Sequence, residues 1–221
     1  MFADRRPADR FSLMTRRRFA CRLAAAAALT SGGWANHAAA DDRMTLGAVN
    51  KLRQLAGATF GKKARLLNIG DKVFRDDLLW TRDGGQLQID MLDGSKLSLG
   101  EDAEVRLDDS LRGSAAASFL DILSGAFRFN SGQAEKPASP PKINTPFAIL
   151  SLRGTEVFGG RLDKTYDIFV FSGEVEVRNE GGAVVLKAGD GTSLVDRKTA
   201  PTPPKAWGQP KINRAKAMLP S

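Results

Sequence analysis

The side chains most often recruited for catalysis are confined to one end of this chain. The only cysteine, Cys21, and the only histidine, His37, lie within the first forty of 221 residues. The part that follows therefore lacks thiol nucleophiles, imidazole acid–base groups, disulfides, and zinc or haem sites built from these side chains. Any chemistry there falls to carboxylates, lysines, arginines, hydroxyls and one tyrosine, Tyr166.

Six carboxylates in the middle of the chain are candidate catalytic groups. Two of them could form the acid and base pair of a glycoside hydrolase, and the same oxygens could hold calcium. They fall, however, in expected turns and on polar strand faces, and their spacing matches neither an EF-hand loop nor a glycine-rich nonapeptide repeat. We therefore expect no enzyme, no metal site and no cofactor; the six acids are Asp90, Asp93, Glu101, Asp102, Asp108 and Asp109.

Arg153 directly follows an apolar stretch of the chain. Residues 147–152 are apolar at both odd and even positions, which predicts a central strand covered on both faces, with Pro146 at its start. Gly154 would either relieve crowding or allow another backbone to approach closely. Arg153 needs a partner: a neighbouring carboxylate would make it a fold determinant, the reading we favour, whereas an anionic ligand would make it a binding residue.

Short alternating segments separated by Gly and Asp turns surround this stretch. Leu87, Ile89 and Met91 alternate with polar residues and are followed by the turn Asp93-Gly94-Ser95. The pattern predicts an all-β fold of many short strands, in a β-sandwich or a short stacked β-solenoid-like arrangement, with little helix.

Three local expectations complete this assignment. Residues 46–65 are expected to form a short strand and a loop, and residues 211–219 a short basic helix with a frayed end. Residues 121–129 resemble residues 167–177, each a strand, a Ser-Gly turn and an alternating strand. This echo suggests a duplicated hairpin or successive coils, although Ser-Gly turns are common enough to match by chance.

The first forty residues have the features of an export signal. A basic region precedes a weakly apolar alanine-rich core that is too short for a membrane span, and the segment ends in an A-x-A motif. The order of Arg16, Arg17 and Phe19 resembles the twin-arginine signal, and Ala38 and Ala40 fit the cleavage site. An ordinary Sec signal or an alanine-rich helix remains the alternative. We expect a periplasmic or secreted protein.

The basic balance of the chain comes mostly from this leader. The whole chain has a net charge of +8 and a pI near 9.9. After residue 40, 26 Lys and Arg face 23 Asp and Glu, a net charge of only +3. We therefore expect neither a nucleic-acid partner nor a membrane-lipid one, and no stable membrane span in the mature chain.

Between residues 46 and 195 a series of short motifs occurs in order: Gly70-Asp71, Asp93-Gly94-Ser95, Ser124-Gly125, Thr145-Pro146-x-Ala148, Arg153-Gly154-Thr155, Ser172-Gly173 and Ala188-Gly189-Asp190. In its order and approximate spacing this series resembles FecR-domain proteins. The resemblance implies a periplasmic all-β domain. Founding members of that family relay a ferric-siderophore signal from an outer-membrane receptor to a sigma factor, through a cytoplasmic segment and a membrane span that we do not expect here. The motif residues, expected to be structural, include Asp93, Gly94, Thr145, Pro146, Arg153, Gly154, Thr155 and Gly173.

Three functions remain open on this basis. The favoured one is a non-catalytic binding module of the cell envelope that contacts an envelope protein or a glycan through a strand edge or turn face. The others are a component of iron-responsive signalling that contacts an outer-membrane receptor, and a carboxylate-dependent glycan-active enzyme. A binding module should show an open strand edge, or an apolar patch near Trp80, Phe158 or Phe169. Of these, we expect Phe169 to lie in the core, and we favour the core for Trp80 as well.

The predicted organisation is a removable signal peptide over 1–40, a FecR-type all-β domain over 41–197 and a Pro-rich basic tail over 198–221. The sequence does not predict the oligomeric state.

Overall fold

A computed structural model describes residues 43–108, 119–132 and 140–220. Contacts divide the chain into Met1–Ala40 and Asp41–Ser221. The export-signal residues Arg16, Arg17, Phe19, Ala38 and Ala40 lie outside the described residues, as does Asp109. The export signal and the domain bounds therefore stay predictions.

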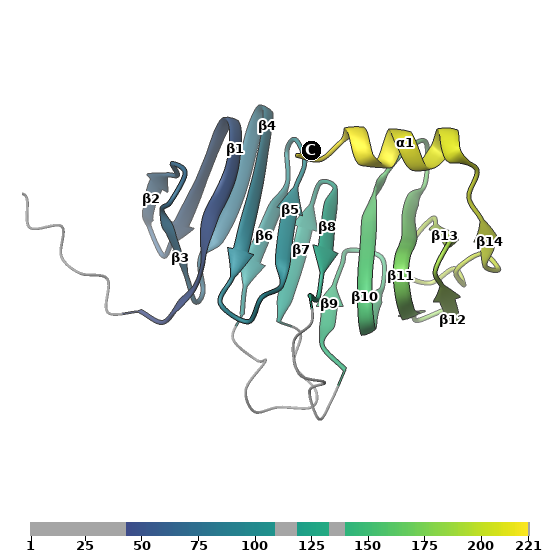
Figure 1. The fold of residues 1–221 in the computed structure, drawn as a ribbon. Helices are drawn as coiled ribbons and strands as arrows, with labels where there is room; N and C mark the ends of the chain where they lie inside the picture. Colours follow the sequence, from purple (N-terminus) through teal and green to yellow (C-terminus); the bar gives the residue numbers. More distant parts are fainter. Residues whose placement is uncertain (1–42, 109–118, 133–139, 221) are drawn as a thin grey trace, which may run out of the picture. The chain divides into compact units, whose positions relative to one another are not determined.

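The described residues form an all-β unit with one helix, which confirms the predicted fold class (Figure 1). All of its strands belong to one sheet. The elements are β1 (Thr45–Phe60), β2 (Lys63–Leu66), β3 (Lys72–Phe74), β4 (Leu78–Met91), β5 (Lys96–Leu99), β6 (Glu104–Leu107), β7 (Leu120–Ser124), β8 (Phe127–Asn130), β9 (Lys142–Asn144), β10 (Ile149–Arg161), β11 (Tyr166–Asn179), β12 (Gly182–Lys187), β13 (Asp190–Leu194), β14 (Lys205–Ala206) and α1 (Gln209–Ala217).

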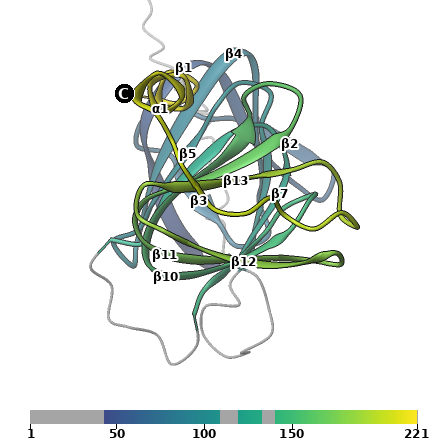
Figure 2. The ribbon, with the colours of Figure 1, turned by 90° about the vertical axis from the view of Figure 1, so that its right-hand side faces the viewer.

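The sheet closes on itself through long strands that change partner along their length. β4 pairs with β6 near its start and with β5 near its end. β10 likewise pairs first with β9 and then with β8. Because β5 pairs with β8, β6 with β7, and β7 with β9, strands β4 to β10 form a barrel-like ring (Figure 2). β1–β3 extend the ring beside β4, and β11–β14 extend it beside β10.

Four strands are much longer than the short strands expected, because bends replace turns within them. β1, β4, β10 and β11 have 16, 14, 13 and 14 residues. Positive φ angles mark the bends, at Gln54 in β1, Gly84 in β4, Gly154 in β10 and Gly173 in β11. Pairing registers shift beside the bends of β1 and β10, as at β-bulges.

The expectation of a short strand and loop over 46–65 is wrong. Most of this stretch is the continuous strand β1, followed by β2. Its glycines fit a strand because they allow close packing: a Cβ on Gly57 would lie 2.2 Å from the Trp80 ring. Trp80 is half-buried there, and its indole N–H donates to Thr59 Oγ1 at 3.1 Å.

β10 is central, as predicted, but its two-sided coverage lies later in the strand than expected. Within 147–152 only one face is fully buried, and Ile149 is 37% exposed. The residues buried on both faces are 157–160. The outer side of this second half lies under the C-terminal helix, which the local pattern of β10 does not reveal.

The two echoing segments use Ser-Gly differently. Gly125, with φ of +82°, separates β7 from β8 as the expected turn. Gly173, with φ of +80°, is instead a bend inside the continuous strand β11, so the expected second turn is wrong. A left-handed glycine changes the chain direction in both copies.

The C-terminal helix is present, but the expected fraying of its end is wrong. Leu219, just beyond α1, is 3% exposed. Leu219 and Ala215 of α1 pack in an apolar cluster with residues from β10 and β11. β14 precedes the helix and pairs with β13, so the Pro-rich segment is also tied to the sheet.

Candidate functional site

The Arg153-Gly154-Thr155 motif forms the bend of β10, directly opposite the bend of β11. The Thr155 hydroxyl is buried, accepts a hydrogen bond from the Arg153 N–H at 2.9 Å and donates to the Glu174 carbonyl oxygen at 2.9 Å. A Cβ on Gly173 would lie 2.2 Å from the Gly154 carbonyl oxygen. A threonine hydroxyl and a bare glycine therefore join the two strands where their register shifts.

Two turns pack against this bend. The Thr155 N–H donates to Ser131 Oγ at 2.9 Å, and the Ser131 N–H donates to the Thr155 carbonyl at 3.0 Å. The next residue, Gly132, lies so close to Gly94 that a Cβ would be 2.5 Å from the Gly94 carbonyl. Asp93 holds the turn around Gly94, because its carboxylate accepts the N–H and hydroxyl of Ser95 at 2.9 and 2.6 Å.

One corner thus contains most of the motif residues predicted from the sequence. We call this set the corner; it comprises Asp93, Gly94, Arg153, Gly154, Thr155 and Gly173, with Ser131 and Gly132 between them.

Thr145 and Pro146 make a separate local turn before β10. The buried Thr145 hydroxyl donates to the Ala148 carbonyl at 2.7 Å and accepts the Ala148 N–H at 3.0 Å. Phe147 in this turn stacks on Tyr166 at 4.8 Å between ring centroids. The turn therefore sets the start of β10 and does not join the corner.

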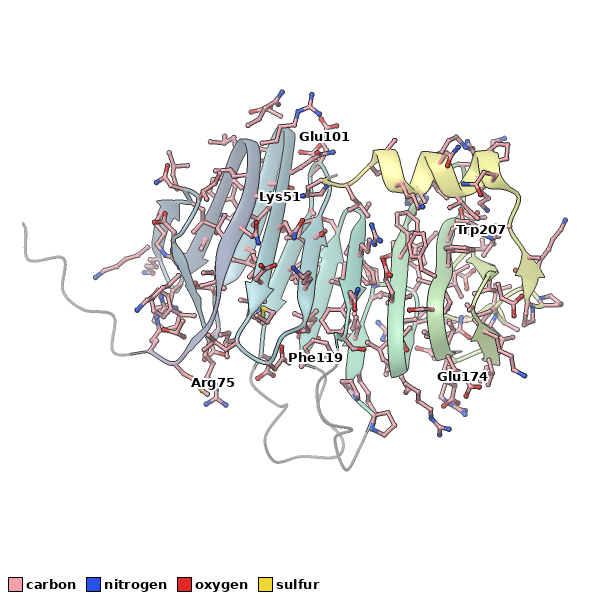
Figure 3. The ribbon with its side chains drawn as sticks, in the orientation of Figure 1. Lys51, Arg75, Glu101, Phe119, Glu174 and Trp207 are labelled. Atoms are coloured by element: carbon pink, nitrogen blue, oxygen red, sulfur yellow. The ribbon has the colours of Figure 1, made fainter. Side chains whose placement is uncertain are left out.

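The charged groups of the corner face solvent. The Arg153 side chain is 72% exposed, and its guanidinium lies 3.9 Å from the Glu174 carboxylate, which is itself 41% exposed. Figure 3 shows Glu174 toward the part of β11 away from α1. An ion pair this open contributes little to stability. Arg153 could instead contact an anionic group of a partner, so its assignment as a fold determinant stays a prediction.

Three of the candidate catalytic acids, Asp90, Asp93 and Glu101, make hydrogen bonds that serve local structure. Burial alone would raise the pKa of Asp90, but hydrogen bonds from Asn50 and Lys96 and the Lys96 charge outweigh it, so the pKa lies below its ordinary value. Glu101 accepts the Gly84 N–H at 2.9 Å beside the bend of β4, and Asp102 adopts a positive φ in the next turn. Among the described residues, no three Asp, Glu, His or Cys side chains are grouped to hold a metal ion.

Sequence reasoning missed two fully buried carboxylates. Asp77 accepts hydrogen bonds from Arg43 and Arg65, each at 2.6 Å, and from the Phe74 N–H at 3.0 Å. Nothing in the sequence sets it apart from Asp76 beside it.

The second missed carboxylate ties the helix to the sheet. Asp167 accepts from Ser193 Oγ at 2.5 Å and Lys211 Nζ at 3.1 Å. Its sequence signal is an acid inside the apolar stretch 166–171, which in a strand implies a buried partner.

Beyond the corner, β12 offers an open margin of the sheet. Its six residues pair with β11 and with no other described strand. Val185 of β12 is 49% exposed, and Lys187 is the only charged residue in the strand. The Lys187 N–H at the end of β12 donates to Asp190 Oδ2 at 3.2 Å. The outer side of β12 over residues 182–186 pairs with no other described strand.

The margins at β2, β3 and β14 have features that discourage pairing. β2 has four residues, two of them basic, and follows Lys62; β3 has three and begins with Lys72. β14 has two residues and directly follows Pro203 and Pro204. Short length, charge and proline are known protections of sheet edges, and β12 lacks them over residues 182–186.

These features define an all-β module with a bent-strand corner and an open edge at β12. Residues 77–176, which span β4 to most of β11, match the family described as FecR protein. The resemblance to the FecR family that the motifs predicted is therefore confirmed over these residues. The corner lies inside the matched region, whereas β12 and α1 lie outside it.

A solved structure with a TM-score of 0.51 shows a similar fold over the matched part of the chain. Two crystal structures of a proposed anti-sigma factor from Parabacteroides distasonis are similar at 17% identity, with TM-scores of 0.51 and 0.49. In each case the match covers 62% of this chain and 62% of the other. No curated protein matches the chain in sequence. Within the described residues, no helix is long and apolar enough to cross a membrane.

Proposed function

We propose that this protein is an exported, non-catalytic binding module of the bacterial cell envelope. The FecR domain supports a regulatory role. The lack of cysteine and histidine after residue 40, and the structural engagement of Asp90, Asp93 and Glu101, argue against catalysis. The leader resembling a twin-arginine signal supports the periplasm as its location.

The observation that carries this proposal is the unprotected edge of β12. An extended segment of another polypeptide would add there as a further strand, with backbone hydrogen bonds providing affinity. Specificity would come from alternate side chains, because Val185 on the exposed face can meet an apolar residue of the added strand. The proposed partner is therefore an envelope protein with an extended apolar segment, and not a glycan.

The proposal is tested by crosslinking the tagged protein in envelope extract and identifying captured proteins by mass spectrometry. Val185→Lys places a charge on the open edge and should abolish capture. Val195→Lys is the matched control, because Val195 is 62% exposed and lies outside the strands. Equal capture by both variants would exclude β12 as the contact, and retention of polysaccharide alone would favour a glycan-binding module.

A second candidate function is envelope signalling, which the FecR domain specifically favours. The similar solved structures are named as those of a proposed anti-sigma factor, which fits this reading by fold alone. Capture of an outer-membrane receptor or an inner-membrane regulator, lost in Val185→Lys and kept in Val195→Lys, would support it. Capture limited to cell-wall proteins would point to a structural role.

A further inference from the structure

An aromatic face on β10 and β11 lies beneath the C-terminal helix. Phe158 and Phe169 are almost completely buried and share an apolar cluster with Ala215 and Leu219 at the end of the chain. Trp207 stacks on Phe169 with 4.7 Å between ring centroids and meets Phe158 edge-on at 6.4 Å. Figure 3 shows Trp207 close to α1. The apolar patch expected near these phenylalanines is therefore present but covered by the chain's own C-terminal segment.

The sheet is shaped for this segment. Gly191 on β13 leaves room for the Trp207 indole, since a Cβ there would lie 2.2 Å from its nitrogen. Phe171 extends the aromatic face, and Arg128 lies over its ring at 4.7 Å.

Charge complementarity orients the helix on this face. Asp167 pairs with Lys211 at 3.1 Å, and Asp163 pairs with Arg214 at 2.9 Å. α1 contains three basic residues and no acidic one. The carboxylates of Asp163 and Asp167 therefore face cations of the helix. One oxygen of the buried Asp167 carboxylate has no hydrogen-bond partner, so Lys211 and Ser193 do not saturate this acid.

The helix itself is weak. α1 has nine residues, no side-chain cap at its start and no acid in its first turn. Isolated helices shorter than about 12–15 residues are marginal in water. Ala215 is its only fully buried residue, and Ile212 packs partly buried against the same cluster, so α1 gains its order from docking on the sheet.

We propose that the outer face of β10 and β11 is a helix-binding site and that α1 is its resident, displaceable occupant. The partner is a protein carrying a longer amphipathic helix with cations spaced like Lys211 and Arg214 and an apolar stripe that covers Phe158 and Phe169. Such a helix displaces α1 because a longer helix forms more readily than nine residues do and keeps both ion pairs, while it covers Phe158 and Phe169 in place of α1. The face lies within the FecR-matched region and α1 lies beyond it. The site is separate from β12, so either proposal can fail alone.

The test supplies α1 in trans to the exported protein purified from the envelope. The probe is a fluorescently labelled synthetic peptide of residues 205–220, followed by anisotropy. In the wild-type protein the resident α1 competes with the probe. If α1 is docked in about 99% of molecules, the apparent affinity of the protein for the probe is about 100-fold weaker than that of the uncovered site. Ala215→Asp puts a charge into the apolar cluster and releases α1, so binding should tighten by at least about ten-fold.

A matched control lies on the same helix. Ala217→Asp makes the same change at an exposed position and should bind the probe as weakly as the wild type. A probe carrying Lys211→Glu and Arg214→Glu should bind Ala215→Asp several-fold more weakly, because both ion pairs are reversed. A folded Ala215→Asp protein that does not bind the probe would overturn the proposal.

Hydrogen exchange on the wild-type protein tests whether α1 detaches from the sheet, even if Ala215→Asp fails to fold. Amides within 211–217 should exchange through local opening, much faster than those of β10 and β11. Exchange of both regions at the same rate would make α1 an integral part of the core and would overturn the proposal. Concentration-dependent dimers that exchange α1 would also overturn it, by making a second copy of the chain the occupant.

Discussion

Replacing Thr155 by valine should destabilise the protein far more than removing the charge of Arg153. The Thr155 hydroxyl makes two hydrogen bonds of 2.9 Å at the corner, one accepted from the Arg153 N–H and one donated to the Glu174 carbonyl. Valine keeps the shape but removes both bonds. Each is worth about 0.5–1.5 kcal/mol, and a buried group left unpaired costs about 1–3 kcal/mol more, so we expect a loss of about 3 kcal/mol.

The same corner predicts a much smaller effect for Arg153→Ala. Its exposed pairing with Glu174 at 3.9 Å is worth at most about 1 kcal/mol. For a unit of this size, 1 kcal/mol corresponds to about 2–4 °C in melting temperature. Thr155→Val should therefore lower the melting temperature by about 6–12 °C, and Arg153→Ala by less than about 4 °C.

The assay is thermal unfolding followed by circular dichroism, with urea unfolding to check that cooperativity is unchanged. Thr155→Ser is the control, because serine keeps the hydroxyl and should retain most of the stability. The reasoning is refuted if Thr155→Val melts like the wild type while Arg153→Ala loses several degrees. In that case the guanidinium, and not the hydroxyl, would hold the corner.

Three further predictions concern a bend, an ion pair and export. In urea unfolding, Gly173→Ala should lower stability more than the control Gly189→Ala. Both glycines have positive φ, but only at Gly173 would a Cβ lie 2.2 Å from a backbone oxygen. Equal losses of stability would show that this clash does not matter. The hydrogen bond from Arg214 lowers the pKa of Asp163, so its stabilisation is present at neutral pH and lost as the pH falls below about 4. Asp163→Asn should thus melt slightly lower than the wild type at pH 7, and this gap should narrow as the pH falls below about 4; a gap of unchanged size in acid would disprove the linkage. Arg16→Lys with Arg17→Lys should leave precursor in the cytoplasm on immunoblots of cell fractions, whereas normal export would identify the Sec route.

The family and the fold class could be predicted because they rest on local signals. Glycine and aspartate turns at regular intervals, with period-two alternation between them, indicate an all-β chain without knowledge of which strands pair. The ordered series from Asp93-Gly94 to Gly173 likewise led to the FecR domain that residues 77–176 match. Phe169 was expected in the core, and it is 2% exposed.

The site could be predicted only in part. Arg153, Gly154, Thr155 and Gly173 were identified as structural candidates, but their residue types drew attention to the charge of Arg153. In the structure the buried Thr155 hydroxyl makes the strand-to-strand bonds, while the guanidinium is exposed. The sequence around Thr155 does not reveal this role of its hydroxyl. The contacts come from Ser131 and Glu174, which are 24 and 19 residues away in the chain.

The sequence alone therefore determined which side chains are available for chemistry, since no cysteine or histidine follows residue 40. It also determined local conformation, through the alternation typical of strands and the glycines where the chain must bend. Tertiary structure decided which of these bends stay inside continuous strands, that β12 is left as an open edge, and that α1 covers Phe158 and Phe169. These outcomes depend on contacts between residues far apart in the chain, such as Asp167 with Lys211, 44 residues on. Burial and pairing of that kind are properties of the packed sheet, and no local pattern encodes them.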